Sequence, residues 1–315
     1  SSSNCLPETS NSNCCFPLHS NSNLLFGVHA NKSGMALAGG LRVGDQVISS
    51  IDFDGVHGKL SIGEIGTVLG PSSDTQASDA SKRVHCRFPR NGNINLLVGT
   101  HVYKKGADLA DGLKVGDEVV SSIDFEGAHG KISIGEIGTV LGPSTDTSAS
   151  DCHKRVHCRF PHNSNINLMV GAHVYKRGAA LADGLKVGDE VISNLDYEGA
   201  HGKISKGEVG VVTGPSTDTS ASDHHKRVHC RFPRNSNINL VVGAHIHKKG
   251  VALAGGLSVG DEVVSDIDFE GAHGKISKGE VGVVAGPSTA PDVSDASKRV
   301  HCRFPHNSNI NLLFG

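Results

Sequence analysis

One seven-residue string recurs at a constant interval along this chain. Arg-Val-His-Cys-Arg-Phe-Pro starts at residues 83, 155, 227 and 299, each start lying 72 residues after the one before. A second string, Val-Gly-Asp, starts at residues 43, 115, 187 and 259 with the same spacing. Because no insertion disturbs the register, the sequence predicts a tandem array of one structural unit. The four repeats are residues 28–99, 100–171, 172–243 and 244–315.

The N-terminal extension, residues 1–27, carries part of the same pattern. Cys14–Pro17 and Asn23–Gly27 lie 288 positions, or four periods, before Cys302–Pro305 and Asn311–Gly315. This agreement predicts that residues 13–27 are the tail of a degenerate repeat. Since the chain starts at Ser1 rather than Met, we expect a processed or fragment end and a parent protein with more repeats.

The composition limits what each repeat can be. The 315 residues include 40 Gly, no Trp and only 4% aromatic residues, so Val, Ile, Leu and a few Phe must fill each small core. A net charge of −2 makes nucleic acid an unlikely partner, because its binding needs a strongly basic surface. No apolar run reaches the length of a membrane span. Frequent Gly and the scarcity of helix-length apolar patterns favour strands joined by turns.

The third repeat illustrates the elements that we expect. Strands are predicted at residues 189–197, 207–213, 227–232 and 238–246, since these runs are rich in β-forming residues and lie between turn signals. One helical turn is expected at residues 179–184, and a polar, flexible loop at residues 214–226. The predicted fold class is therefore all-β, with a small closed or half-open barrel in each repeat.

The order of motifs in each repeat resembles a known type of module. Leu185–Val191 carries L-x-V-G-D-x-V, Gly207–Gly214 carries G-x-x-G-x-V-x-G, and Arg227–Phe232 carries R-V-x-C-x-F. This order is similar to that of SH3-like barrels of the KOW or Mind-bomb type. The resemblance covers most of every repeat and implies a tandem array of four small SH3-like β-barrels, of a kind that mostly binds proteins or RNA without catalysis. The chain departs from it in lacking the Trp residues of the Mind-bomb type and in its longer polar loop.

A second resemblance points to a different fold. Ala252–Val264 looks like the middle of a PDZ domain. A PDZ domain would continue with a helix that walls its peptide groove, whereas a Gly-rich strand and a Ser/Asp loop follow here. The sequence therefore favours the barrel.

The third predicted strand provides the best candidate for an interaction site. Val228, Cys230 and Phe232 should share one face, and the intervening Arg, His and Arg should share the other. In all repeats together this basic stripe consists of Arg83, His85, Arg87, Arg155, His157, Arg159, Arg227, His229, Arg231, Arg299, His301 and Arg303. Such a stripe fits phosphate, a sulfated glycan or a row of partner carboxylates. The alternative is that it pairs with Asp196 and Glu208 on neighbouring strands.

Other repeated polar residues are candidates for chemistry. The chain has 19 His, and one set lies in the repeated G-x-H-G turn: His57, His129, His201 and His273. They are the candidates for a metal site, although they lack the short ligand spacing typical of zinc sites. The repeated Cys lies on the apolar face, which favours burial over a nucleophilic role. Nothing meets the requirements of a catalytic site, so no enzyme activity and no cofactor are expected.

Three hypotheses about function follow from the repeat. The first is a non-enzymatic structural protein, such as a filament, coat or scaffold subunit, that associates with itself or with another protein. The second is a multivalent binder of anionic glycan or nucleic acid through the basic stripe. The third is a His-rich metal-binding repeat protein. The compartment stays open, with a secreted protein favoured.

Overall fold

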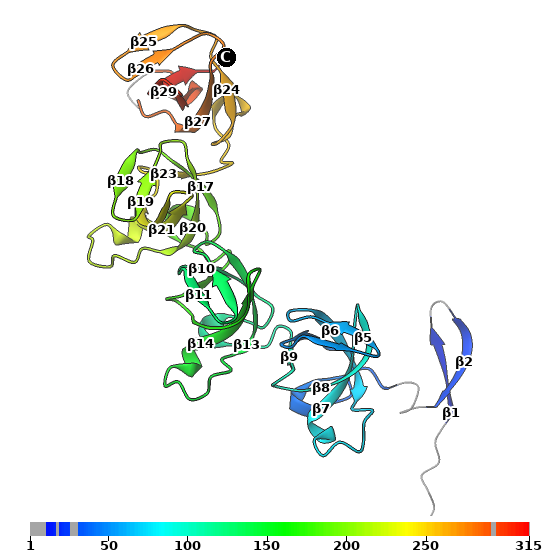
Figure 1. The fold of residues 1–315 in the computed structure, drawn as a ribbon. Coiled ribbons are helices and arrows are strands. Elements are labelled where there is room, and N and C mark those ends of the chain that lie inside the picture. The colour runs from blue at the N-terminus through cyan, green and yellow to red at the C-terminus, as the bar shows by residue number, and fades with distance from the viewer. Residues whose placement is uncertain (1–10, 17–18, 26–30, 291–293, 315) are drawn as a thin grey trace, which may run out of the picture. The chain divides into compact units, whose positions relative to one another are not determined.

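A computed structural model describes residues 11–16, 19–25, 31–290 and 294–314. The first ten residues of the N-terminal extension lie outside the described residues. By its contacts the chain divides into two compact units, one reaching Asp117 and including Thr139–Arg159, the other containing Glu118–Gly138 and the chain from Phe160 onward. The described chain is all-β, which confirms the predicted class, and Figure 1 shows similar strands returning in each repeat.

The N-terminal extension contains a hairpin. Strands β1 (Asn11–Phe16) and β2 (His19–Leu25) pair antiparallel, with Asn11 opposite Leu25 and Phe16 opposite His19. The corresponding strands of the fourth repeat pair in the same register, because Arg299 lies opposite Leu313 and Phe304 lies opposite Asn307. The hairpin thus reproduces the last two strands of a repeat.

The first repeat forms a seven-stranded antiparallel sheet in the order β4-β5-β8-β7-β6-β3-β9. Its strands are β3 (Gln46–Ser49), β4 (Phe53–Gly55), β5 (Gly58–Leu60), β6 (Ile65–Pro71), β7 (Arg83–Phe88), β8 (Asn91–Leu97) and β9 (Val102–Lys104). Strand β9 follows the sequence boundary at residue 99, so the second repeat supplies the strand that ends the sheet of the first.

Repeats 2 and 3 have the same strand order. The second repeat contains β10 (Glu118–Ser121), β11 (Phe125–Gly127), β12 (Gly130–Ile132), β13 (Ile137–Pro143), β14 (Arg155–Phe160) and β15 (Asn163–Met169), with β16 (Val174–Lys176) at the edge. The third contains β17 (Glu190–Ser193), β18 (Tyr197–Gly199), β19 (Gly202–Ile204), β20 (Val209–Pro215), β21 (Arg227–Phe232) and β22 (Asn235–Val241), with β23 (Ile246–Lys248) at the edge.

The sheet of the fourth repeat has six strands in the order β24-β27-β28-β29-β26-β25. They are β24 (Glu262–Val264), β25 (Phe269–Gly271), β26 (Gly274–Ile276), β27 (Val281–Pro287), β28 (Arg299–Phe304) and β29 (Asn307–Leu313). Strand β24 takes the place of β3 and lies at the edge of the sheet.

Short 3-10 helices punctuate each repeat. One set is η1 (Ala38–Gly40), η3 (Ala110–Gly112), η5 (Ala182–Gly184) and η7 (Ala254–Gly256), and the other is η2 (Ala80–Lys82), η4 (Cys152–Lys154), η6 (His224–Lys226) and η8 (Ala296–Lys298). The expected helical turn at residues 179–184 is therefore η5. Its middle residue, Asp183, has a φ of 49°, a left-handed conformation that Asp tolerates better than most residues.

Two of the strands predicted in the third repeat are interrupted. The run 189–197 breaks after β17, because the Ser193 hydroxyl donates to the Leu195 carbonyl at 2.8 Å and accepts from its N–H. Such a local turn competes with the sheet ladder. The run 238–246 breaks after β22 at Gly243, whose φ is 81°.

The core of each repeat follows from the alternation in its RVHCRF strand. In repeat 3, Val228, Cys230 and Phe232 are buried together with Ile204 from β19 and Val212 from β20. Strand β20 approaches the Phe232 ring closely at Gly210, where an added Cβ would lie 2.6 Å from the ring. Gly210 therefore makes room in this strand for the aromatic ring of the core.

Candidate functional site

The first Arg of the basic stripe forms an ion pair inside its own repeat. Arg227 Nε lies 2.7 Å from Asp223 Oδ1, and Arg227 Nη2 lies 3.0 Å from Asp223 Oδ2. This hydrogen-bonded pair lowers the pKa of the Asp223 carboxyl. Every repeat has an equivalent Arg–Asp pair. The alternative prediction from the sequence was that the stripe pairs with Asp196 and Glu208. The carboxylates of these two residues instead accept the backbone N–H groups of Lys206 and Ser205, respectively.

The His of the stripe is buried in repeats 2–4. The sequence predicted that it would be exposed, because it lies on the strand face opposite the core. His229 is 3% exposed, and its two ring nitrogens lie 2.8 Å from Thr213 Oγ1 and from Asn237 Oδ1. Burial lowers the pKa of this imidazole. His157 and His301 are equally buried, whereas His85 in the first repeat is half-buried.

The third residue of the stripe reaches the preceding repeat. Arg159 Nη1 donates to the carbonyl oxygen of Ile62 at 2.5 Å. The equivalent Arg231 and Arg303 lie against Gly135 and Gly207, so that added Cβ atoms there would stand 3.6 Å and 3.2 Å from the nearest atoms of these side chains. In repeats 2–4 the stripe therefore forms part of a joint between consecutive repeats.

An apolar cluster forms a second part of the joint. Ile48 from β3 packs with Val115 and Leu141 of the next repeat, and all three are at most 2% exposed. Burying a side chain the size of Ile stabilises a contact by about 1.5–3 kcal/mol. The equivalents of Ile48 in repeats 2 and 3, Val120 and Ile192, are also buried.

A shared sheet edge forms the third part of the joint. Strand β9 leads into the second repeat and pairs with β3, with Ile48 opposite Tyr103 and Val47 opposite Lys104. Lys104 Nζ also lies 2.8 Å from Asp45 Oδ2. In repeat 3 the same arrangement joins β17 to β23, and Lys248 lies 2.7 Å from Asp189.

The residue in the middle of the shared strand packs on a glycine in the long strand of its own repeat. An added Cβ at Gly142 would lie 2.8 Å from the Tyr103 ring, and one at Gly214 would lie 2.7 Å from the Tyr175 ring. Burial raises the pKa of both tyrosines. At the third joint His247 takes the same place over Gly286.

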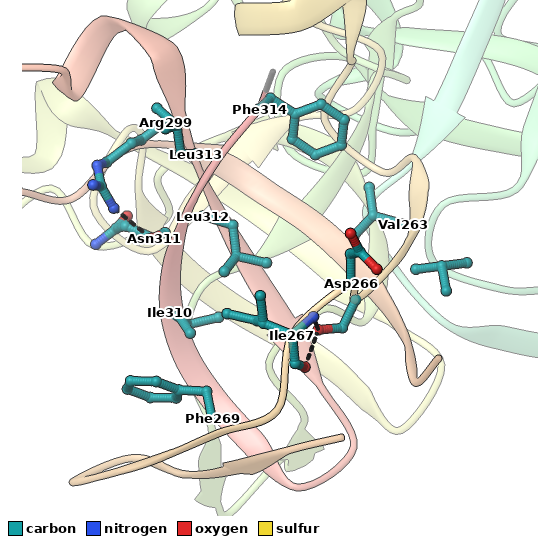
Figure 2. Close-up of a pocket in the computed structure, with 12 residues that line it drawn as sticks. Val263, Asp266, Ile267, Phe269, Arg299, Ile310, Asn311, Leu312, Leu313 and Phe314 are labelled. Atoms are coloured by element: carbon teal, nitrogen blue, oxygen red, sulfur yellow. Dashed lines mark hydrogen bonds between the residues drawn. The ribbon is translucent and has the colours of Figure 1, made fainter. Parts of the chain in front are cut away.

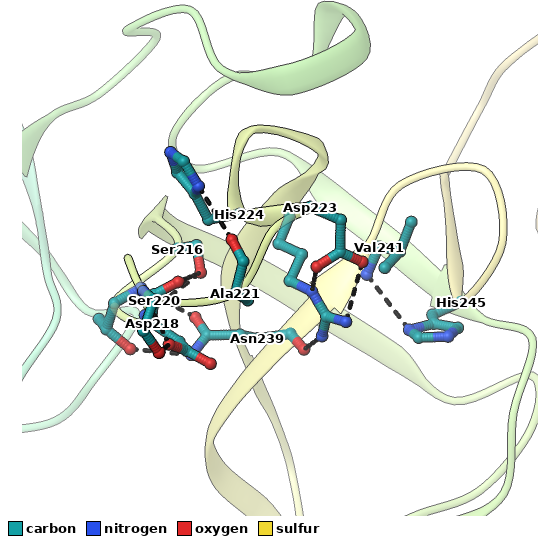
Figure 3. A network of polar contacts seen from close by, with 11 residues as sticks. Ser216, Asp218, Ser220, Ala221, Asp223, His224, Asn239, Val241 and His245 are labelled. Atoms are coloured by element: carbon teal, nitrogen blue, oxygen red, sulfur yellow. Dashed lines mark hydrogen bonds and ion pairs between the residues drawn. The ribbon is translucent and has the colours of Figure 1, made fainter.

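The polar loop of each repeat is held in place by hydrogen bonds, although the sequence suggested flexibility. In repeat 3, Asn239 accepts the Thr217 N–H at 3.0 Å and donates to the Thr217 hydroxyl at 2.9 Å. The Asp218 carboxylate accepts the Ser220 hydroxyl at 2.6 Å. Figure 3 shows Asp218, Ser220 and Asn239 of this network near Asp223, the partner of Arg227. Asn239 thus holds the start of the loop against the neighbouring strand.

The candidates for metal chemistry are dispersed. His57, His129, His201 and His273 are all exposed, each in the turn of a short hairpin. Within the described part of the chain, no group of three or more His, Cys, Asp or Glu is placed to hold a metal ion. The repeated cysteines are buried, and burial raises the pKa of the Cys86 and Cys302 thiols to about 12.

Two features of the repeats were not predicted from the sequence. Ile48 lies in an ordinary alternating strand, and Tyr103 lies in a short strand. Neither strand contains a distinctive motif, although both residues form part of the joint. Each repeat also exposes one aromatic side chain at the same position of its short hairpin: Phe53, Phe125, Tyr197 and Phe269. The exact 72-residue recurrence of an aromatic residue was the only available signal for the second feature.

Comparisons with known proteins give no assignment. No family model matches the chain, and no curated protein matches it. Among the described residues, no helix is both long enough and apolar enough to cross a membrane.

Proposed function

We propose that this chain is a non-enzymatic tandem-repeat assembly protein, a filament, coat or scaffold subunit that acts through repeated protein–protein contacts. The observation that carries the proposal is the joint between repeats. It combines a buried aliphatic side chain, a shared strand and an Arg that reaches the preceding repeat, and equivalent positions build it three times. A surface that binds the next copy of the same unit suits open-ended assembly.

The fold that we propose for each repeat is the SH3-like barrel of the KOW or Mind-bomb type. The consecutive pairing of β3 with β6, β6 with β7 and β7 with β8 supports this proposal. Such small barrels present their binding surfaces at strand edges and loops, which is where the joint lies.

The alternative of an anionic ligand bound along the stripe has less support. The stripe His is buried in repeats 2–4, the first Arg is paired with Asp, and the third Arg contacts the preceding repeat. Binding of a sulfated glycan that is unchanged by combined Arg→Ala substitutions at residues 227 and 231 and at their equivalents would exclude this alternative. The metal-binding alternative is tested by elemental analysis of the native protein, which it requires to contain stoichiometric metal.

The proposed function is tested by the size of the purified protein in solution. We expect sedimentation velocity to show species larger than one chain that grow with concentration, and negative-stain electron microscopy to show them as regular multimers. A single species with the mass of one chain at every concentration would overturn the proposal.

A further inference from the structure

We propose that the third joint, between the third and fourth repeats, binds a small oxyanion of the phosphate or sulfate type between Lys206 and Arg303. This inference goes beyond the proposed function, which does not depend on it. Both residues belong to the second compact unit of the chain. The site thus lies between two repeats of one unit.

The third joint differs from the other two in the side chains that surround its apolar contact. At the first joint, Ile62 and Tyr103 pack against the buried cluster that contains Ile48. The second joint has the same two residue types at these positions, whereas the third joint has Lys206 and His247. Two basic side chains therefore enter a part of the joint that is uncharged elsewhere.

Arg303 brings a further base to the same place. Its Nη1 atom would lie 3.2 Å from a Cβ added to Gly207, the residue that follows Lys206. Lys206 and Arg303 are both half-buried, and among the described residues neither of them forms an ion pair. Burial lowers the pKa of the Lys206 ammonium, and the charge of Arg303 lowers it further. The two cations therefore lie close enough to repel each other.

The acid beside Lys206 does not neutralise this pair of cations. The charge of Asp196 opposes the fall in the pKa of Lys206. However, Asp196 is exposed, and its carboxylate accepts the backbone N–H of Lys206 at 2.9 Å. Half-buried charges are stable when they are paired. An anion between Lys206 and Arg303 would supply the pairing that the described residues leave out.

His301 is a buried base of this joint that lacks a hydrogen-bond partner at Nδ1. It is only 2% exposed. In the third repeat the equivalent nitrogen of His229 lies 2.8 Å from Thr213 Oγ1, but Ala285 takes the place of that Thr in the fourth repeat. Burial, followed by the charge of Lys206, lowers the pKa of His301 to about 4. The interior of the joint is therefore both polar and short of negative charge.

A cleft of suitable size lies beside these bases. It has a volume of about 200 Å³ and is lined by Gly207 of the third repeat and by Arg303, Pro305 and part of β27 of the fourth. Sites for drug-sized ligands have volumes of about 300–1,000 Å³, so this cleft fits a small ion better. Guanidinium and ammonium groups commonly bind phosphate and sulfate oxygens.

The second joint has a cleft at the same place but lacks the second cation. That cleft has a volume of about 480 Å³, and Gly135 and Arg231 line it in the positions of Gly207 and Arg303. Ile134 stands where the third joint has its Lys, and the carboxylate side chain of Glu190 also lines the cleft. We therefore assign the anion to the third joint.

A larger groove of the fourth repeat is less suited to an anion. It has a volume of about 680 Å³ and is lined by β24, the turn after it and β29 (Figure 2). The charged residues that line it are Asp266 and Arg299. Arg299 is paired with Asp295 at 2.8 Å. The lining residues of this groove therefore offer an anion no unpaired base.

A metal ion fits the third joint less well than an anion. His247 and His301 are near each other, since the charge of His247 contributes to the low pKa of His301. Within the described ranges, no third His, Cys, Asp or Glu joins them in a group that could hold a metal. Lys206 and Arg303 would also repel a metal cation. The charges around the cleft therefore favour a negative ligand.

Isothermal titration calorimetry of the full chain with inorganic phosphate tests the proposal. We expect one site per chain, for which sulfate competes. Lys206→Ile should weaken binding by roughly tenfold or more, and it should fold normally, because Ile occupies this position at the other two joints. Arg303→Gln is a second variant with the same expected loss. Circular dichroism checks that both variants keep the fold of the parent.

The matched control is Lys278→Ile. Lys278 holds the equivalent position of the fourth repeat, where it is exposed and lies 2.7 Å from Asp266. This variant loses the same charge as Lys206→Ile and should bind phosphate like the parent. At constant ionic strength, phosphate should raise the melting temperature of the parent and of Lys278→Ile, but not that of Lys206→Ile.

Two results would overturn the proposal. One is that the parent shows no saturable binding at millimolar phosphate, and the other is that folded Lys206→Ile binds as tightly as the parent. Titration with glycerol 3-phosphate identifies the source of the oxyanion. Affinity equal to that of inorganic phosphate indicates that the site takes a phosphate group on a larger molecule, whereas much weaker binding indicates the free ion.

Discussion

The ring of Tyr103, on the strand that the second repeat adds to the sheet of the first, lies over Gly142 in β13 of the second repeat. The contact is so close that a Cβ on Gly142 would stand 2.8 Å from the Cδ2 atom of the ring. Tyr175 and Gly214 repeat this contact one period later, and His247 takes the same place over Gly286. A glycine at this position of the long strand therefore allows consecutive repeats to pack closely.

Replacing Gly142 by Ala should loosen the joint between repeats 1 and 2. The added methyl group collides with the partly buried ring of Tyr103. Such overpacking lowers the free energy of unfolding by about 1–3 kcal/mol. We expect a lower denaturant midpoint by circular dichroism. The control is Gly92→Ala, since an added Cβ there meets no atom within 4 Å. Equal midpoints for the two variants would show that the Tyr103–Gly142 contact adds no stability.

Replacing Asn239 by Ala should release the polar loop of the third repeat. The substitution removes two hydrogen bonds to Thr217, each of which contributes about 1 kcal/mol. We expect faster cleavage within residues 216–226 by a protease of broad specificity, mapped by mass spectrometry. Ser236→Ala on the same strand is the control and should leave the cleavage rate unchanged. Cleavage at the parent rate in Asn239→Ala would contradict the role of the network.

The buried stripe His makes stability depend on pH. Burial, with a smaller contribution from the charge of Lys206, lowers the pKa of His301 from 6.5 to about 4. The unfolded chain has the ordinary pKa and takes up the proton first as the pH falls. The folded state should therefore lose stability below about pH 6.5, by an amount on the order of 2 kcal/mol at pH 5.

This dependence is measured by comparing denaturant midpoints of the parent and a His301→Gln variant between about pH 7.5 and 5. The variant lacks the titrating group, so its midpoint should fall less steeply as the medium becomes acidic. His273→Gln removes an exposed imidazole and should keep the slope of the parent. A slope in His301→Gln as steep as in the parent would exclude His301 as the titrating group.

Cysteine labelling should separate two classes of thiol. Cys86, Cys158, Cys230 and Cys302 are buried, and burial raises the pKa of each, so their reactive thiolate form is suppressed. Cys152, in the polar loop, is partly exposed. We expect iodoacetamide to modify Cys152 in the native protein and the four repeated Cys only after denaturation. Rapid native labelling of Cys230 would contradict the buried strand face.

Much of the fold was predictable because it follows from local pattern. The alternation of Val228, Cys230 and Phe232 against polar neighbours predicted both the strand and its buried face, and β21 has the predicted bounds. The 72-residue period predicted that each repeat has the same strands. The break in the strand after Ser193 was not predicted. It comes from hydrogen bonds between the Ser193 hydroxyl and the backbone two residues later, and such bonds do not alter the periodicity of apolar residues.

The role of the stripe was not predictable in the same way. Alternation places Arg227, His229 and Arg231 on the face opposite the core, but it does not reveal what covers that face. In repeats 2–4 the third residue of the stripe reaches the preceding repeat, as Arg159 does at the carbonyl oxygen of Ile62. His229 is instead buried between Thr213 and Asn237 of its own repeat. The joint depends on contacts between residues about one period apart, which only the folded chain brings together.

Hydrogen–deuterium exchange at the joints between repeats tests the central claim most directly. The N–H groups of Ser50, Ser122 and Asn194 donate to carbonyls of the next repeat at 2.7–2.9 Å. We predict that an Ile48→Ala variant, which lacks the side chain packed on Val115 and Leu141, exchanges faster than the parent at Ser50 and at the parent rate at Asn194. Unaltered exchange at Ser50 in this variant would contradict the joint between the first two repeats.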